Sequence, residues 1–441
     1  MNRRDLLRRM LWGGLGAASA EAPVQAAVEQ ATRGMPVPRI KDLSVIEVGA
    51  GGVNDSTVVK VTTDQAGLYG YGCATASFPG GRSKLVAAAV ERYLKPLLLN
   101  RPTDRIEQLW QICYMSSYYK NDTVLNTAIG GACDALWDIK GRQAAMPVYQ
   151  LVGGKCREAA DIYLHVSMGS RDPARELIEN SMKLTAKGCR NLLVAMFARD
   201  GAADTLYGQP RFEDGTPAFD RDKETRKILT AFERFRKEMP EDIGLAVDVH
   251  SLLDPIRAVQ FARDVEPFRL FYCEDLLAPE EAGHYAIVRQ LCSTPLAIGE
   301  LWNNPQEWRP LVERRQIDYI RHHVSHVGGF TAARKIAAFA ENYEVKFAWH
   351  GAPNSPVGHV TNLTLDLTCE NFGIHEHFDY PPLVQDVFHG VAEIKNGYAW
   401  ISDRPGWGIE VDEALAAKHP ISDERPNEFR TPDGSVIQGT G

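Results

Sequence analysis

Three acidic residues that end successive apolar stretches constrain the fold of this chain more than any other feature. Asp248, Glu274 and Glu300 each close a short apolar run, and 26 residues separate each from the next. A helix-like segment follows each of them. A strand–helix unit of this length is the repeat of a (β/α) barrel, whose parallel strands end at one common mouth. The spacing therefore predicts barrel strands that bring three carboxylates together at the mouth.

The acidic trio also predicts a cation site. Three like charges at one buried place are costly unless a cation lies among them. A single acidic residue at a strand end is commonly a turn or helix cap, but equal spacing at the same place in the repeat favours a shared site. Because the ligands are hard oxygens, without Cys or His, we expect Asp248, Glu274 and Glu300 to bind Mg²⁺ rather than zinc.

The same rhythm extends to eight strands. We expect them over residues 161–166, 189–197, 244–250, 270–274, 296–300, 319–324, 345–349 and 372–374. Helix starts support this assignment, because Asp254 and Asn304 each precede a proline, as a capping residue does before Pro at the first helical position. Thr331 is a candidate cap for a helix over 332–342. Residues 155–394 are thus predicted to form the barrel.

The region before the barrel, residues 37–154, predicts an α+β capping domain. An antiparallel meander is expected over 40–48, 56–61 and 68–74, followed by helices over 85–94, 103–115 and 125–142. In the last helix, Gly130 and Gly131 would let another element approach closely. Residues 395–441, with a strand over 397–401, are predicted to form a C-terminal segment that packs back on the cap.

Residues 1–36 have the form of a twin-arginine export signal and linker. Arg3 and Arg4 precede a short, weakly apolar run that is too short to span a bilayer, and small residues follow it. We therefore expect a periplasmic protein without membrane association after export, or a cytoplasmic one if the signal is not used. The eight cysteines form no CxxC pair, and several lie in apolar runs and are predicted to be buried free thiols.

The charge balance limits the class of partner. A formal net charge of −8 disfavours a nucleic-acid partner, which needs a basic surface. A small anionic substrate remains compatible with this composition if the site itself is cationic.

Several histidines are candidates for proton transfer at the barrel mouth. Asp248 and His250 stand two apart, so strand alternation would direct both to the same face and place His250 beside the metal. His350 ends the seventh predicted strand and would face His250 across the mouth. Imidazole suits such a role because its ordinary pKa is about 6.5.

Three further residues end or lie on predicted strands. They are His165 on the first, Arg321 on the sixth and Glu376 on the last. The Arg321 guanidinium could bind a substrate carboxylate, or it could balance the acidic cluster. Both roles stay open on the sequence.

This set of residues predicts removal of a proton next to a carboxylate. A metal on three carboxylates can chelate the substrate carboxylate and stabilise the enediolate that forms when the neighbouring carbon loses its proton. A base and an acid on opposite faces complete the reaction. If the acid protonates the same carbon, the product is the racemised or epimerised acid. If it protonates a β-hydroxyl group, water is eliminated.

Six longer motifs carry a family resemblance. They span residues 135–141 (ALWDIKG), 147–154 (PVYQLVGG), 318–321 (DYIR), 348–351 (AWHG), 355–359 (SPVGH) and 371–374 (NFGI). With the acidic trio, they make the chain similar, over about residues 38 to 415, to the enolase superfamily of the mandelate racemase/muconate lactonizing enzyme type. Within it the mannonate dehydratase subgroup is most similar. The resemblance implies a (β/α)₇β modified TIM barrel, capped by the α+β domain and completed by the C-terminal segment, with Mg²⁺ on the three carboxylates.

The resemblance also implies a reaction and roles for residues. The reaction is dehydration of an aldonic acid to a 2-keto-3-deoxy acid, with His250 as general acid or second proton-transfer group. His165, Arg321, Glu376 and His350 would surround the substrate. A homo-oligomer with an even number of subunits (dimer, tetramer or octamer) is expected as well.

Two positions depart from the subgroup pattern. Its base is a Tyr paired with an Arg, and Tyr207 matches the Tyr, but Leu193 stands at the Arg position. Without a nearby cation a Tyr of pKa about 10 is a poor base at neutral pH, so His350 becomes a rival base. Ser77 stands in a cap loop where the subgroup carries Asn, which leaves the identity of the sugar open.

Two alternatives to a dehydratase follow from the same residues. One is a racemase or epimerase that uses His250 and His350 on opposite faces. The other is a non-catalytic sugar-acid binding protein that kept the fold and lost its base, for which Leu193 is the favouring feature.

Overall fold

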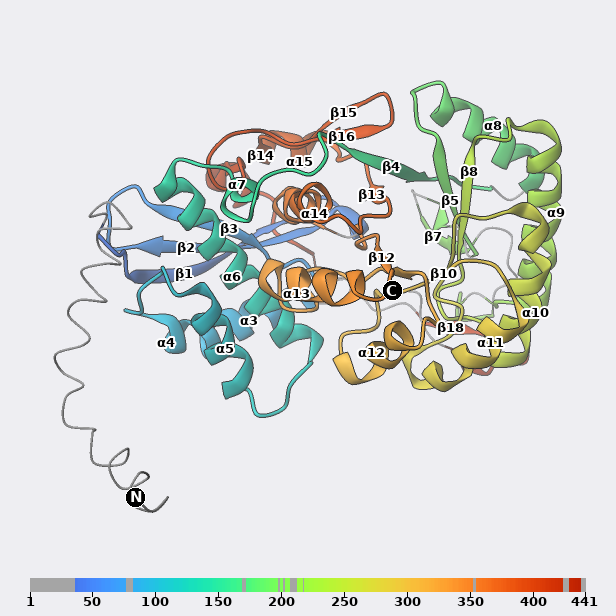
Figure 1. The fold of residues 1–441 in the computed structure, drawn as a ribbon, viewed down its shortest axis with the longest axis horizontal. Helices are drawn as coiled ribbons and strands as arrows, with labels where there is room; N and C mark the ends of the chain where they lie inside the picture. The colour runs from blue at the N-terminus through green and yellow to red at the C-terminus, as the bar shows by residue number, and fades with distance from the viewer. Residues whose placement is uncertain are drawn as a thin grey trace, which may run out of the picture.

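The computed structural model describes residues 36–76, 82–168, 172–196, 199–200, 203–206, 212–216, 218–351, 354–422 and 428–437. Within them a capping domain and a barrel lie side by side (Figure 1). Two predicted site residues, Ser77 and Tyr207, lie outside the described residues. No helix in the described ranges combines the length and apolar character that crossing a membrane requires.

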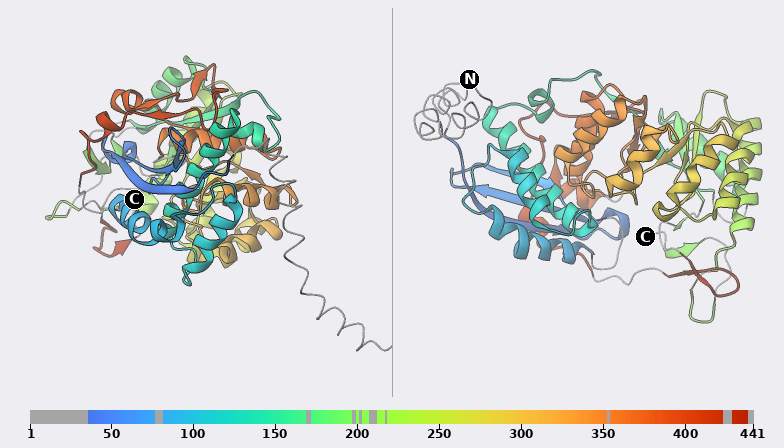
Figure 2. Two further views of the ribbon diagram at one scale, coloured as in Figure 1. Left: turned by 90° about the vertical axis from the view of Figure 1, so that its left-hand side faces the viewer. Right: turned by 60° about the horizontal axis from the view of Figure 1, so that its bottom comes forward.

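The cap is a three-stranded antiparallel sheet with helices packed against it (Figures 1 and 2). The sheet order is β1 (Ile40–Val48), β2 (Ser56–Thr63) and β3 (Tyr69–Cys73), which confirms the predicted meander. The helices are α3 (Arg82–Ala89), a π-helical segment (Val90–Leu94), α4 (Lys95–Leu98), α5 (Ile106–Ser116), α6 (Thr123–Ala144) and the short α7 (Val148–Leu151).

Helix α6 joins the cap to the barrel because its small residues let two elements reach its backbone. A Cβ atom on Gly72 of β3 would lie 1.9 Å from the carbonyl oxygen of Gly131. A Cβ atom on Gly130 would lie 2.9 Å from the nitrogen of Gly329, which immediately precedes α13 (Phe330–Glu341). The sheet and α13 therefore pack directly on α6, as the two glycines predict.

The barrel has eight parallel strands in the described part of the chain. They are β4 (Ala160–His165), β5 (Asn191–Ala195), β8 (Gly244–Asp248), β9 (Cys273–Glu274), β10 (Leu296–Ile298), β11 (Tyr319–Ile320), β12 (Lys346–Phe347) and β13 (His375–His377). Strand β13 pairs with β4 and closes the barrel.

Helices follow the first seven strands and cover the outside of the barrel (Figure 1). They are α8 (Pro173–Thr185), α9 (Arg221–Glu238), α10 (Pro255–Asp264), α11 (Tyr285–Leu291), α12 (Pro305–Glu313), α13 and α14 (Pro356–Thr368). The arrangement is a (β/α)₇β barrel with a cap, so the predicted fold class is confirmed. The predicted helix starts are confirmed at α10 and α12, where Asp254 and Asn304 accept hydrogen bonds from first-turn backbone N–H groups.

Several elements begin a few residues from the predicted position, and two of these differences bear on the site and on the junction between the domains. The eighth strand is His375–His377 rather than 372–374, and Phe372 makes only an isolated bridge to Phe347. Helix α13 begins at Phe330, so Thr331 is not its cap. The carboxylate of Asp134 on α6 accepts the Phe330 N–H at 2.8 Å instead, which means that the cap domain supplies the helix cap.

The C-terminal residues divide between the two domains. Strand β16 (Tyr398–Trp400) pairs with β4, and beyond it Glu413 forms an ion pair with Lys60 of the cap at 2.5 Å. Strands β18 (Phe429–Arg430) and β19 (Val436–Ile437) instead form a hairpin beside the barrel, seen in the right view of Figure 2. There the Phe219 N–H donates to the Arg430 carbonyl at 2.7 Å. The prediction that residues 395–441 pack on the cap is therefore wrong for this hairpin, because backbone pairing holds it to the barrel.

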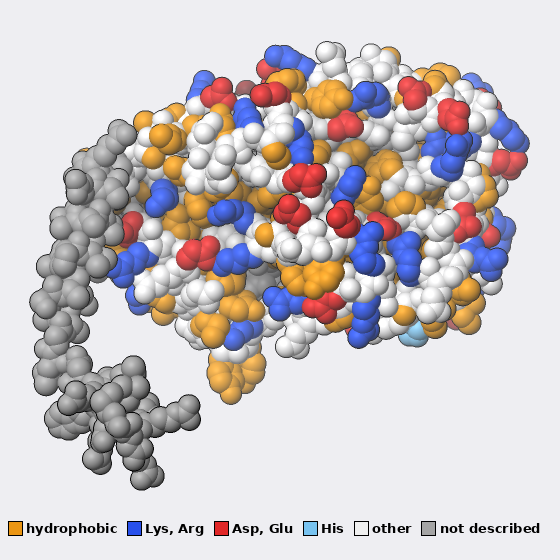
Figure 3. Space-filling model, viewed as in Figure 1, with side chains coloured by type: hydrophobic (Ala, Val, Ile, Leu, Met, Phe, Trp, Pro, Cys, Tyr) orange, Lys and Arg blue, Asp and Glu red, His pale blue; other side chains and the backbone are white. Residues whose placement is uncertain are grey.

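The thiols and the surface agree with the composition. All eight cysteines are free, and Cys156 is exposed and Cys369 half-buried while the others are buried. On the face drawn in Figure 3, Lys and Arg side chains alternate with Asp and Glu. This mixed pattern is unlike the basic stripe of a nucleic-acid-binding face.

Candidate active site

The three predicted carboxylates lie at the ends of three adjacent strands. Asp248 and Glu274 are register partners on β8 and β9, and Glu300 follows β10 by two residues. They are 4%, 1% and 6% exposed. The Oε2 atom of Glu274 is buried and has no hydrogen-bond partner among the described residues. A buried acceptor without a donor, among oxygen ligands only, fits a hard divalent cation such as Mg²⁺.

The carboxylates are less tightly gathered than predicted. Among the described residues, the only group of three or more His, Cys, Asp or Glu whose ligand atoms all lie within 4.8 Å of one another is elsewhere. The Oε1 atom of Glu274 lies 2.5 Å from Nε of Arg321. Burial raises the pKa of Glu274 well above its usual value against the opposing pull of Arg321, and the charge of Asp248 adds to the rise. Attraction to the guanidinium and repulsion between carboxylates both spread the group.

Arg321 is the centre of a buried ion-pair network. Its Nη2 lies 2.6 Å from Oε2 of Glu376, so it bridges Glu274 and Glu376. The guanidinium carbon lies 5.6 Å from the ring centres of both Tyr163 and Tyr272. Because Arg321 is only 1% exposed, its geometry favours the second of its two predicted roles, balancing the acidic cluster.

His250 reaches Asp248 by another route than strand alternation. Strand β8 ends at Asp248, and His250 and Ser251 have φ of 54° and 57°, in the left-handed region that non-glycine residues rarely adopt. The backbone N–H of His250 donates to Oδ1 of Asp248 at 2.9 Å, and the ring atom Nε2 of His250 lies 2.5 Å from Oδ2 of Asp248. A tight turn thus brings the imidazole back to the carboxylate. The predicted position beside Asp248 is found, but the period-two explanation is wrong.

His250 and His350 lie against the same carboxylate. Nε2 of His350 is 2.9 Å from Oε2 of Glu300, and Nε2 of His250 is 3.8 Å from Oε1. Burial lowers the pKa of His250, but the charges of Asp248 and Glu300 outweigh it and raise the pKa to about 9. The pKa of His350 is raised too, because Glu300 and Glu376 outweigh burial. A divalent cation on these carboxylates would oppose both rises.

His165 and Glu376 form a hydrogen-bonded pair where β4 meets β13. Nε2 of His165 lies 2.7 Å from Oε1 of Glu376, and the Gly351 N–H donates to Oε2 at 2.7 Å. The side chain of His165 is 34% exposed and that of Glu376 1%. Glu376 is the middle residue of β13 rather than its end, and it holds the more exposed imidazole in place.

Leu193 lies in the barrel interior, where the resemblance implies an Arg. It is 1% exposed and packs in an apolar layer with Tyr163, Ala246, Tyr272 and Ala297. No cation is presented from this position to the mouth. Since Tyr207 lies outside the described residues, the choice between Tyr207 and His350 as base stays a prediction.

Asp275, the residue after Glu274, has a role at the site that was not predicted from the sequence. Asp275 is fully buried with φ of 42°, and its Oδ1 accepts the Gly299 N–H at 3.1 Å. Burial, followed by the charges of Glu300 and Asp248, raises its pKa to about 8. This bond fixes the backbone just before Glu300. The available signal was a second acidic residue directly after a strand-end glutamate.

A pocket of about 350 Å³ between cap and barrel opens onto Glu300. Its wall includes Ala76, Arg82 and Thr123 from the cap and Glu300, Asn303 and His326 from the barrel. A small molecule bound there would touch both domains.

Comparisons with known proteins agree with this geometry. Residues 35–153 match the mandelate racemase/muconate lactonizing enzyme N-terminal domain, and residues 198–415 match the enolase C-terminal domain-like family. A D-galactonate dehydratase family member of Salmonella enteritidis is 38% identical over 415 residues, covering 90% of this chain and 98% of that protein. One of Paenibacillus is 42% identical over 365 residues, covering 82% and 88%.

A solved structure extends the likeness to three dimensions. The crystal structure of an enolase from Pantoea ananatis, with bound D-gluconate and Mg, superposes with a TM-score of 0.86 at 37% identity, covering 90% of this chain and 99% of that one. Relatives, family domains and fold converge on one assignment: the chain belongs to the enolase superfamily.

Proposed function

We propose that this protein is a Mg²⁺-dependent acid-sugar dehydratase that converts an aldonic acid to a 2-keto-3-deoxy acid. One observation carries the proposal: Asp248, Glu274 and Glu300 end three adjacent strands, and two imidazoles lie against the last of them. The names of the D-galactonate dehydratase relatives and the D-gluconate and Mg in the Pantoea ananatis structure support an acid sugar as substrate and Mg²⁺ as cofactor.

Each residue has a distinct task in this reaction. Mg²⁺ held by the three carboxylates would bind the substrate carboxylate and stabilise the additional negative charge that develops on its oxygens as the neighbouring carbon loses its proton. His250, held by Asp248, is placed to protonate the departing β-hydroxyl group. His165, oriented by Glu376, is placed to bind a sugar hydroxyl. Burial raises the pKa of both carboxyl groups that pair with Arg321, and the guanidinium outweighs burial at Glu376 but not at Glu274.

For the base we choose His350 over Tyr207. The buried Leu193 offers no cation that would lower the pKa of a Tyr, whereas Nε2 of His350 already lies at the mouth, 2.9 Å from Glu300. His350→Asn should then stop proton exchange at C2, while Tyr207→Phe should reduce turnover only modestly. If the two variants behave the other way round, Tyr207 is the base.

The test is turnover with a panel of aldonates, including D-gluconate, D-mannonate and D-galactonate, each with Mg²⁺ and with a chelator. The expected result is formation of a 2-keto acid from at least one member, lost when Mg²⁺ is removed. Binding of acid sugars, seen as thermal shifts, without turnover of any member would instead support the non-catalytic binding protein.

A racemase or epimerase is the second candidate, because His250 and His350 contact the two oxygens of one carboxylate. NMR in D₂O separates the two reactions. Exchange at C2 without loss of water favours the racemase, whereas a deuterated 3-deoxy product supports the dehydratase.

We further propose export to the periplasm and an even-numbered homo-oligomer. The first rests on Arg3 and Arg4, and fractionation of cells that express the Arg3→Lys, Arg4→Lys variant tests it. The second rests on the family resemblance, and light scattering tests it. The connection between α5 and α6 projects at the lower edge of Figures 1 and 3. It carries Tyr118 and Tyr119, which are 83% and 81% exposed and whose rings a neighbouring subunit could bury.

A further inference from the structure

A cluster of three buried histidines lies outside the site described above. His359, His375 and His377 are 5%, 1% and 5% exposed, and one ring nitrogen from each lies within 4.8 Å of the others. His359 stands on the second turn of α14, and the other two are on β13. The reaction proposed above uses none of them.

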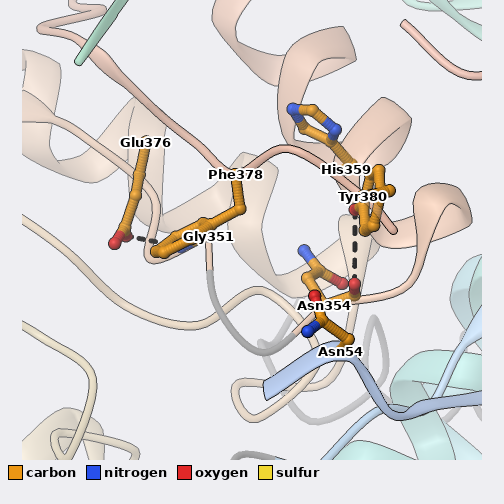
Figure 4. Close-up of a pocket in the computed structure, with 7 residues that line it drawn as sticks. All are labelled: Asn54, Gly351, Asn354, His359, Glu376, Phe378 and Tyr380. Atoms are coloured by element: carbon orange, nitrogen blue, oxygen red, sulfur yellow. Dashed lines mark hydrogen bonds between the residues drawn. The ribbon is translucent and has the colours of Figure 1, made fainter. Parts of the chain in front are cut away.

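Strand alternation separates this cluster from the barrel mouth. Glu376 points inward, where it meets Arg321 at 2.6 Å. Its two neighbours on β13 therefore point outward, toward α14. Figure 4 shows Glu376 and His359 at opposite ends of a small pocket, and Tyr380 stands next to His359.

Two carboxylates lie against the ring nitrogens of His375 and His377 that face away from the centre of the cluster. Nδ1 of His375 lies 2.6 Å from Oδ2 of Asp366 on α14, and Nε2 of His377 lies 3.3 Å from Oδ1 of Asp379. This leaves Nε2 of His375 and Nδ1 of His377 turned toward His359. An imidazole that donates one N–H to a carboxylate and offers its other nitrogen to the centre is the usual arrangement around a protein-bound metal.

The spacing of the nitrogens suits a tetrahedral cation after a small adjustment. Zinc–nitrogen bonds of about 2.1 Å place neighbouring ligand nitrogens about 3.4 Å apart. Nδ1 of His377 and Nε2 of His359 are 3.5 Å apart, which already fits. Nε2 of His359 and Nε2 of His375 are 2.6 Å apart, so the His359 ring must rotate slightly to admit the ion.

The surroundings also keep the ligands in the right form. Burial, together with His375 and His377, holds the pKa of His359 well below its usual value, and burial lowers the pKa of His377. Neutral imidazole is the form that binds metal. The small pocket that His359 lines has barely the room for one water molecule, which would suit a fourth ligand.

We propose that His359, His375 and His377 bind a first-row transition cation, Zn²⁺ or one of similar preference, that fastens α14 to β13. Three imidazole ligands select such a cation over Mg²⁺, which prefers oxygen. The ion stiffens β13 on both sides of Glu376, and so helps to hold the residue that orients His165 and pairs with Arg321.

The test uses the full chain without a histidine tag, in excess Mg²⁺ so that the carboxylate site is filled. Calorimetry with Zn²⁺, and visible absorption with Co²⁺ as a probe of tetrahedral nitrogen ligation, should each report one equivalent bound. His377→Asn should abolish this binding, and Asp248→Asn, which affects only the mouth, should leave it intact. If Asp248→Asn abolishes all binding of Zn²⁺ and Co²⁺, or if wild type binds neither ion, the proposal is overturned. The three histidines would then form only a hydrogen-bonded chain.

A substitution at the surface tests the same site without the risk that a change at a buried histidine prevents folding. The Asp379 side chain is 80% exposed, so Asp379→Asn should fold normally while it weakens Zn²⁺ binding about 10-fold, the lower end for a residue that supports a ligand. The control is His389→Asn, at the exposed second residue of β14 (Phe388–His389), which should leave the affinity unchanged. Equal Zn²⁺ affinity in wild type, Asp379→Asn and His377→Asn would place the ion elsewhere and refute this site.

Discussion

The barrel mouth and the junction between α6 and α13 both bury carboxylates, and they treat them in opposite ways. At the mouth, Glu274 and Glu376 meet the Arg321 guanidinium, and Glu300 meets two imidazoles. At the junction, Asp134 has only the backbone N–H of Phe330, and its Oδ2 has no partner among the described residues. Burial raises the pKa of Asp134 to about 7. At the mouth, His250 and His350 outweigh burial at Glu300 and lower its pKa to about 2, and Arg321 outweighs burial at Glu376 and holds its pKa well below the usual value. The mouth therefore keeps these two carboxylates charged, whereas the junction uses a carboxyl group as a helix cap.

Asp248→Asn should have the largest effect, and it tests whether the carboxylates of the mouth bind a cation. Loss of one of three anionic ligands should abolish Mg²⁺ binding and lower kcat/KM by at least about 10³-fold, because the substrate carboxylate loses its cation. The thermal midpoint should change little, since this charge serves the cation rather than the fold. Mg²⁺ titration by calorimetry measures the first effect, with the exposed Asp386→Asn as control. Wild-type Mg²⁺ affinity would show that the ligands are wrongly assigned.

His250→Asn separates proton transfer from metal binding. The variant should keep Mg²⁺ affinity close to wild type and lose about 10²- to 10⁴-fold in kcat, the usual contribution of a general acid. The variant should keep the left-handed backbone at position 250, because Asn, like His, tolerates positive φ better than most residues. Normal turnover by this variant would remove His250 from the reaction.

Arg321→Met tests whether the cation below the mouth is structural. It would leave Glu274 buried without its cation and Glu376 with only the His165 ring and the Gly351 N–H, and removing one partner of a buried ion pair costs about 3–5 kcal/mol. Chemical unfolding of the two proteins measures the difference. A double variant, Arg321→Met with Glu376→Gln, should recover part of the loss. If Arg321→Met is as stable as wild type but fails to bind acid sugars, the alternative role in substrate binding is correct.

The sequence predicted most of what repeats and missed what depends on contacts across the fold. Equal spacing was enough to place Asp248, Glu274 and Glu300 on adjacent strands, since it follows from the length of the strand–helix unit. It could not show the left-handed turn at His250, the cap that Asp134 provides to α13, or the outward pair His375 and His377, because each requires a neighbour distant in the chain. His375 and His377 were visible as alternate residues beside Glu376, but the strand was placed three residues too early.

Asp134→Asn should have the smallest effect on turnover, and its effect on stability is specific to the junction. The folded-state pKa of about 7 lies above the value of about 3.9 in an unfolded chain, so between these pH values the folded protein keeps a proton that the unfolded chain has lost. The free energy of unfolding therefore falls as pH rises through this window, by at most about 1.4 kcal/mol per pH unit for this group.

Asn keeps an oxygen to accept the Phe330 N–H and cannot ionise, so the variant should lose this part of the pH dependence and be the more stable protein at pH 8. Asp134→Ala, which also removes the acceptor, should lower stability at every pH. Thermal midpoints of the three proteins between pH 5 and 8 measure both effects, with acid-sugar turnover unchanged in Asp134→Asn. Parallel curves for wild type and Asp134→Asn would mean that Asp134 is ionised throughout, and the contrast between mouth and junction would then be one of position, not of charge.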